Sequence, residues 1–188
     1  MSPELDAIAV ALCVTRALDS LGIRSSIGGS IASSVAGEPR STLDVDIVAA
    51  IEVPHVQPLA VALAGEFYVD ERALRRAVRS RRSTNVIHQA SQIKVDLFVA
   101  GGTPLDHDLL ARRQAIEIQG QTIYVHAPED ILLQKLRWFR LGGERSDRQW
   151  QDVLGIVRVQ AGRLDTEYVR LHAAAMGVAD LIERVLAP

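Results

Sequence analysis

Hydrophobic and polar positions repeat with two different periods along this chain. Up to about residue 126, short runs with a period of two, typical of strands, are interspersed with runs that repeat every three to four residues, typical of helices. In residues 43–51, for example, apolar side chains alternate with Asp44 and Asp46, so the two carboxylates share one face. From Pro128 onward only the helical period remains. The pattern therefore predicts an α+β region over residues 1–126, followed by an all-helical region over residues 127–188.

The first region is expected to form a mixed sheet flanked by helices, with the helical region packed on it, either as a second domain or within one compact domain. Ser146 and Gln149 have the spacing of a capping box at the start of one helix. The expected strands are residues 23–27, 43–51, a short segment near 67, 84–88, 92–100, 115–118 and 122–125. The expected helices are residues 3–21, 30–36, 54–64, a segment from 71, 104–113, 128–141, 146–160, 166–176 and 179–186.

Composition indicates a soluble globular protein. The 188 residues are 48% hydrophobic and 23% charged, which is enough to bury a sizeable core. The longest apolar run, residues 7–14, is far shorter than the ~20 residues that span a bilayer. The N-terminus lacks the layout of a signal peptide, and Cys13 alone excludes an internal disulfide or a cysteine-rich metal site. We therefore expect a cytoplasmic protein that does not enter membranes.

Positive charge is concentrated in one segment, although the net charge of −2 argues against nucleic-acid binding over the whole surface. Residues 71–82 contain six arginines and a single acid, Glu71. A solvated helix face is the usual explanation for such a run. The alternative is contact with a polyanion such as tRNA, although aromatic residues that could stack on bases are only 4% of the chain. Four of these arginines recur at three and four residues and so share one helix face: Arg72, Arg75, Arg76 and Arg79.

The candidate chemistry lies in three segments of the first region. Gly28-Gly29-Ser30 falls at a strand-to-helix turn, where backbone N–H groups and the helix N-terminus can approach phosphate oxygens. Asp44 and Asp46 lie on the next strand, ~7 Å apart along the chain, and Asp96 lies between apolar neighbours on a later strand. If those strands are neighbours, the three carboxylates converge and can hold two divalent ions for phosphoryl or nucleotidyl transfer. Each segment alone is weak, because glycine turns and exposed acids are common.

In combination, these segments resemble the signature of the DNA polymerase β-like nucleotidyltransferase superfamily. The matching residues are Gly28-Gly29-Ser30, thirteen intervening residues, Asp44-Val45-Asp46-Ile47, and then Asp96. The segment from Ile27 to Ile47, with residues 37–42 before the acids, further resembles the AbiEii-type branch, which includes toxin-associated nucleotidyltransferases. The run Ala127-Pro128-Glu129-Asp130 is similar to the helical C-terminal region of that branch. Lys135, Asp147 and Asp152 are similar to the helical C-terminal region of that branch. The resemblance covers about residues 23–157.

The resemblance implies an enzyme that transfers NMP from an NTP to a hydroxyl or an RNA end, tRNA included, and releases pyrophosphate. Asp44, Asp46 and Asp96 would bind Mg²⁺, with two ions favoured and Mn²⁺ as a substitute, and Asp96 would also activate the acceptor. Gly28, Gly29 and Ser30 would hold the triphosphate. A toxin with an antitoxin partner is one form of this prediction. The alternatives from other classes are an inactive nucleotide-binding or interaction module and a small-molecule, antibiotic-modifying nucleotidyltransferase.

Four further residues are predicted to bind the nucleotide. Lys94 shares the strand face of Asp96 and could reach a phosphate or pair with Asp96. Lys135 emerges near an apolar helix stripe, either as a snorkelling lysine or as a cation for the triphosphate. Arg40 could meet a phosphate or lie on the loop surface, and Thr42 would share the face of the acids if their strand begins early. Asp152 is interpreted as structural, in an i,i+4 pair with Arg148.

Overall fold

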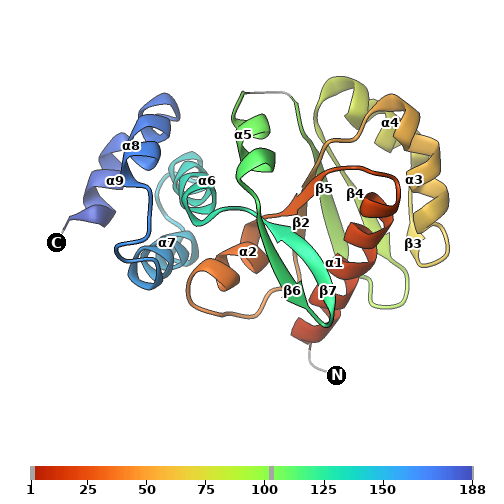
Figure 1. The fold of residues 1–188 in the computed structure, drawn as a ribbon, viewed down its shortest axis with the longest axis horizontal. Helices are drawn as coiled ribbons and strands as arrows, with labels where there is room; N and C mark the ends of the chain where they lie inside the picture. The colour runs from red at the N-terminus through yellow and green to blue at the C-terminus, as the bar shows by residue number, and fades with distance from the viewer. Residues whose placement is uncertain (1–2, 102–103, 188) are drawn as a thin grey trace. The chain divides into compact units, whose positions relative to one another are not determined.

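The computed structural model describes residues 3–101 and 104–187 (Figure 1). The chain folds into two compact units. The first comprises Met1–Ile31 and Ser41–His126, and the second comprises Ala32–Arg40 and Ala127–Pro188. Helix α2 (Gly29–Ala36) begins in the first unit and ends in the second, so the second unit takes a short segment from the N-terminal half of the sequence.

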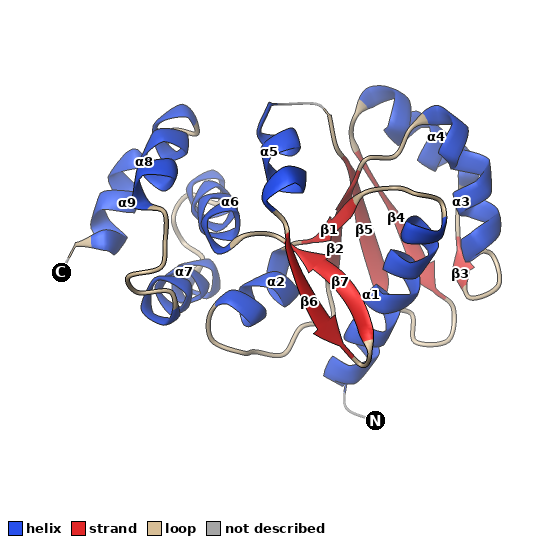
Figure 2. Ribbon diagram, in the orientation of Figure 1, coloured by secondary structure: helices blue, strands red, loops and turns tan. Residues whose placement is uncertain are grey.

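The first unit is built on a mixed seven-stranded sheet, which confirms the predicted fold class (Figure 2). The strand order is β3-β4-β5-β2-β1-β7-β6. β2 pairs in parallel with β5 and antiparallel with β1, and β1 pairs in parallel with β7. The strands are β1 (Ser25–Ile27), β2 (Val45–Ala49), β3 (Phe67–Tyr68), β4 (Ser83–His88), β5 (Lys94–Val99), β6 (Gln114–Ile118) and β7 (Gln121–Val125).

The two faces of the central strands bury different side chains. Val45, Ile47 and Ala49 of β2 are fully buried, whereas the alternate positions are half-buried. On the half-buried face, α5 (Pro104–Arg112) packs Leu109 and Leu110 against Val48. Three further helices belong to this unit: α1 (Pro3–Ser20), α3 (Val56–Leu63) and α4 (Glu71–Ser80). The 3₁₀ turn η1 (Val53–His55) leads into α3, which packs against both α1 and α4. Helices α1 and α4 also contact strands of the sheet.

The second unit is helical and is held partly by buried acids. Glu129 accepts a hydrogen bond from the Asp165 backbone N–H at 3.0 Å, and Asp130 accepts one from the Tyr168 hydroxyl at 2.8 Å. Both carboxylates lie in the first turn of α6 (Pro128–Leu141) and accept these bonds from the start of α8 (Thr166–Ala175), which offsets part of the cost of burying them. The helices are α6 (Pro128–Leu141), α7 (Asp147–Val159), α8 (Thr166–Ala175) and α9 (Ala179–Leu186).

The observed elements differ from the prediction mainly at their ends. The strand expected over residues 43–51 forms only at Val45–Ala49. The Ser146 side chain accepts from the Gln149 backbone N–H at 3.4 Å, but Gln149 Oε1 has no hydrogen-bond partner among the described residues, so only half of the expected capping box forms. Within the described ranges, no helix is both long enough and apolar enough to cross a membrane.

Candidate active site

The sheet aligns two of the three predicted catalytic acids. Asp46 on β2 and Asp96 on β5 are direct partners in the register of neighbouring parallel strands. Residues paired in this way point to the same face, ~4.8 Å apart across the ladder. Asp44 precedes β2 and is exposed, so it lies just outside the strand rather than on it. The expectation that the two strands are neighbours is confirmed.

The glycine turn lies directly against Asp46. Gly29 has a φ of +55°, and a Cβ placed on it would come within 1.8 Å of Asp46 Oδ2. Gly28 donates its N–H to the Asp46 carbonyl oxygen at 2.8 Å. The Gly28 amide is therefore engaged within the sheet. Gly29 and Ser30 lie at the start of α2, where the N-terminus of a helix favours phosphate oxygens.

A buried histidine that the sequence analysis did not single out packs under this turn. The His126 side chain is 1% exposed, and its Nε2 would be 2.6 Å from a Cβ built on Gly28. Its Nδ1 lies 2.7 Å from the Ser26 hydroxyl, whereas Nε2 has no hydrogen-bond partner among the described residues. Burial lowers the pKa of His126 to about 3, so the ring is neutral at physiological pH. Gly28 is thus required sterically, because the ring leaves no room for a side chain.

Lys94 already neutralises part of the acidic face. Its Nζ lies 2.7 Å from Asp96 Oδ2, with the two side chains 48% and 26% exposed. The hydrogen bond to Asp96 raises the pKa of Lys94, and the charges of Asp44 and Asp46 act in the same direction. Of the two interpretations of Lys94, the structure contains the pairing with Asp96.

The donor set matches a hard divalent cation in its chemistry, because Mg²⁺ and Mn²⁺ prefer carboxylate oxygens. The absence of a Cβ on Gly29 allows the glycine turn to pack directly against the Asp46 carboxylate. However, no three Asp, Glu, His or Cys side chains in the described parts of the chain are gathered into a group that could hold a metal ion. The backbone brings Asp46 and Asp96 to one register, but the three carboxylates do not converge as expected: Asp44 lies outside β2, and Asp96 is paired with Lys94.

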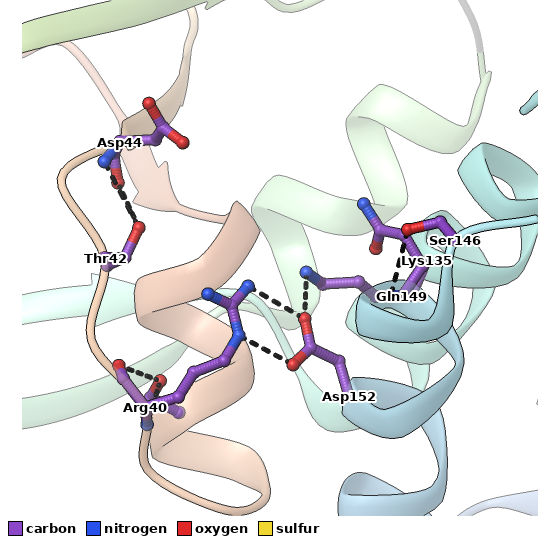
Figure 3. Close-up of polar contacts among 8 residues, drawn as sticks. Arg40, Thr42, Asp44, Lys135, Ser146, Gln149 and Asp152 are labelled. Carbon is purple, nitrogen blue, oxygen red and sulfur yellow. Dashed lines mark hydrogen bonds and ion pairs between the residues drawn. The ribbon is translucent and has the colours of Figure 1, made fainter.

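Two neighbours of the acids have roles that the sequence did not reveal. Thr42 lies outside β2, so it does not share the strand face as expected; its hydroxyl accepts from the Asp44 backbone N–H at 3.2 Å and shapes the turn into β2 (Figure 3). Asn85 on β4 pairs in register with Asp96 and is exposed, which extends the polar row to a third strand. The alternation in residues 84–88 predicts the strand but not its register, so only the pairing identifies Asn85.

Arg40 and Lys135 meet on one carboxylate in the second unit (Figure 3). Arg40 Nε is 2.8 Å from Asp152 Oδ1, its Nη2 is 3.0 Å from Oδ2, and Lys135 Nζ is 2.6 Å from Oδ2. Burial alone would raise the pKa of Asp152, but the hydrogen bonds from the two cations hold it below its usual value. Lys135 is only 5% exposed, so it does not snorkel, and Asp152 pairs with these cations rather than with Arg148 as expected.

The cationic face on α4 forms as predicted. Leu74, Ala77 and Val78 are buried, and the arginines lie on the opposite side. Arg75 pairs with Glu71 at 2.7 Å, so one of the four has a local acidic partner. Three of the arginines are exposed and Arg75 is half-buried: Arg72, Arg75, Arg76 and Arg79.

Neither a protein-family model nor a curated protein sequence matches the chain. Solved structures do match it. An antigenic nucleotidyltransferase-like protein from Paracoccidioides brasiliensis aligns with a TM-score of 0.57 at 19% identity, covering 99% of this chain and 94% of that one. This chain has the nucleotidyltransferase-like fold.

Two other structures extend the same similarity. The antibiotic-resistance factor ANT(2'')-Ia aligns with a TM-score of 0.59 at 12% identity over 96% of both chains, and it has also been solved with adenylyl-2''-tobramycin. The Megavirus polyadenylate synthase aligns with a TM-score of 0.51 at 15% identity, covering 84% of this chain but 32% of the synthase. At these identities the similarity establishes the fold, and the reaction must be argued from the site.

Proposed function

We propose that this protein is a divalent-metal-dependent nucleotidyltransferase that moves NMP from an NTP to an acceptor hydroxyl. The observation that carries the proposal is the in-register pair Asp46 and Asp96, with the Gly29 turn seated against Asp46, within a nucleotidyltransferase-like fold. A plain exposed strand face would need neither a left-handed glycine against one acid nor a lysine bound to the other.

In the proposed reaction, the acceptor oxygen forms a bond to the α-phosphorus while the bond from that phosphorus to the β-phosphate oxygen breaks. Asp96 takes the acceptor proton, and pyrophosphate leaves with the displaced electron pair. Asp44, Asp46 and Asp96 would hold Mg²⁺ or Mn²⁺, which supplies positive charge to the α-phosphate and the leaving group. The amides of Gly29 and Ser30 would bind phosphate oxygens at the start of α2.

The four remaining residues that were predicted to bind the nucleotide differ in their contacts. Lys94 faces the acids, and Thr42 acts on the backbone of Asp44. Arg40 and Lys135 stay predictions based on the resemblance to the AbiEii-type branch, and both bind Asp152 in the structure. We therefore assign the triphosphate first to the Gly29 turn and treat these four as testable additions.

The direct test is transfer of label from each α-³²P-NTP, with Mg²⁺, to total cellular RNA, to protein or to a panel of aminoglycosides. Asp46→Asn should lower transfer at least ~100-fold, because a lost metal ligand removes several kcal/mol of charge stabilisation. Asp44→Ala should act in the same direction. Glu117→Gln removes an exposed acid from β6 of the same unit and should leave transfer unchanged. Wild-type transfer by both aspartate variants would refute the assignment.

RNA is the favoured acceptor because of the arginine face on α4. Replacing Arg72, Arg75, Arg76 and Arg79 with glutamine should weaken RNA binding and flatten its salt dependence, since each phosphate contact contributes to the slope of log K against log salt. NTP affinity, measured in parallel at the same two salt concentrations, should not change. Unchanged RNA affinity in this variant would mean that the arginine face of α4 is a solvated surface that does not bind RNA.

A small-molecule acceptor is the second candidate, favoured by the similarity in fold and length to ANT(2'')-Ia, which is described as an antibiotic-resistance factor. Label on an aminoglycoside rather than on RNA would select it. NTP binding that needs Mg²⁺ without transfer to any acceptor would instead indicate an inactive binding module. If the protein is the toxin of a toxin–antitoxin pair, its expression should arrest growth, and Asp44→Ala should abolish the arrest.

A further inference from the structure

Lys94 occupies an unusual place among the acids of the first unit. It begins β5, two residues before Asp96, so both side chains lie on the same strand face. Its Nζ is 2.7 Å from Asp96 Oδ2, and its charge also interacts with Asp44 and Asp46. One ammonium thus pairs with Asp96 and interacts through its charge with the other two candidate metal ligands.

The position has an electrostatic reason. Asp46 and Asp96 lie in register on adjacent strands, where like charges directly opposite one another repel. A cation on the same face relieves that repulsion. The ammonium meets the acids as a compact point charge on a flexible stem, which makes Lys94 easier to displace than a bidentate arginine would be.

We propose that Lys94 is a resident counterion of the acidic row, held on Asp96 in the metal-free protein and released from it when a divalent cation binds. The proposal rests on the proposed function, because it assumes that the acids are metal ligands. Released from Asp96, the ammonium is free to swing from the carboxylate toward an anionic group of the substrate. The lysine therefore reduces the negative charge of the metal-free site and lowers the affinity of that site for the metal.

Binding of Mn²⁺ alone to the full chain tests this without any turnover. Free Mn²⁺ is counted by electron paramagnetic resonance during titration of the wild type, Lys94→Met, Lys94→Arg, Arg24→Met and Asp46→Asn. Lys94→Met should bind Mn²⁺ roughly 3- to 10-fold more tightly, because no partly exposed ion pair has to be broken and no like charge remains nearby. Lys94→Arg keeps the charge and can bind Asp96 in a bidentate way, so it should bind Mn²⁺ no more tightly than the wild type. Arg24→Met removes one positive charge from an exposed position of the same unit and should also resemble the wild type.

The outcomes separate the two levels of the argument. Mn²⁺ binding by the wild type that Asp46→Asn abolishes, together with an unchanged or lower affinity in Lys94→Met, would overturn the counterion role while leaving the metal site standing. Absence of Mn²⁺ binding in both the wild type and Lys94→Met would overturn the metal site and the counterion role together. Thermal unfolding in metal-free buffer tests whether the Lys94–Asp96 pair only stabilises the fold. In that case Lys94→Met would have a lower melting temperature without binding Mn²⁺ more tightly, which would contradict the counterion role.

Discussion

His126 makes the stability of this protein depend on pH below about 6.5. The ring is 1% exposed, its Nδ1 is bonded to the Ser26 hydroxyl, and burial lowers its pKa to about 3. In the unfolded chain a histidine has a pKa of roughly 6.5. Below pH 6.5 the unfolded chain therefore binds a proton that the native protein excludes, and acid favours unfolding.

The magnitude follows from the two pKa values. The contribution of His126 to the free energy of unfolding should be complete above pH 6.5. It should fall by roughly 1.4 kcal/mol per pH unit between pH 6.5 and pH 3. Between pH 7 and pH 5 the loss amounts to about 2 kcal/mol. A loss of this size is a substantial fraction of the ~5–15 kcal/mol that stabilises a typical domain.

Urea unfolding followed by circular dichroism at pH 8, 7 and 5 measures the effect. The wild type should be equally stable at pH 8 and 7 with respect to this group and lose about 2 kcal/mol by pH 5. His126→Asn keeps an amide that can bond Ser26 but cannot be protonated in this range. It should be less stable at pH 7, and its loss between pH 7 and 5 should be smaller than that of the wild type by about the same 2 kcal/mol. Equal pH dependence in the two proteins would refute the reasoning.

Two other predictions concern a clash and a buried charge. Gly29→Ala should strongly reduce nucleotidyl transfer, because the added Cβ would displace the Asp46 carboxylate. Gly22 also has a positive φ but has open space around it, so Gly22→Ala should cost only ~1 kcal/mol of stability and leave transfer intact. Equal transfer by both variants would contradict the clash. Asp152→Asn should destabilise the protein by about 3 kcal/mol in urea unfolding, because it removes the carboxylate that balances buried Lys135 and half-buried Arg40. Adding Lys135→Met should recover part of that loss, and strict additivity would show that the charges are not coupled.

The elements of this fold were accessible from the sequence because each has a local signal. The period of two around Asp46 and Asp96 marked both strands, and the helical period marked the C-terminal region. Strand ends were less predictable: Asp44 continues the alternation but lies outside β2, because Thr42 turns the backbone there through its hydroxyl. Local pattern therefore identified the acids, whereas their register came only from the pairing of β2 with β5.

Interaction partners that lie far apart in the sequence could not be predicted from it. Asp152 lies four residues after Arg148, and the helical spacing favours that pair. In the structure Asp152 lies next to Val153, which is buried on α7, and it binds Arg40, 112 residues away. A buried carboxylate gains more from hydrogen-bonded cations that share its low-dielectric surroundings than from an exposed arginine on its own helix. Sequence spacing does not contain that information.

The adjacent glycines of the turn illustrate how much packing can lie behind a short motif. Gly28 is required by the His126 ring, which comes from the end of β7, and Gly29 is required by the Asp46 carboxylate on β2. The Gly28 N–H binds the Asp46 carbonyl, and the His126 N–H binds the Ile27 carbonyl, so both flanking strands hold the same turn. The turn is therefore fixed from two sides before any ligand arrives. Such fixation is what a phosphate-binding turn needs if its amides are to meet a substrate without reorganising.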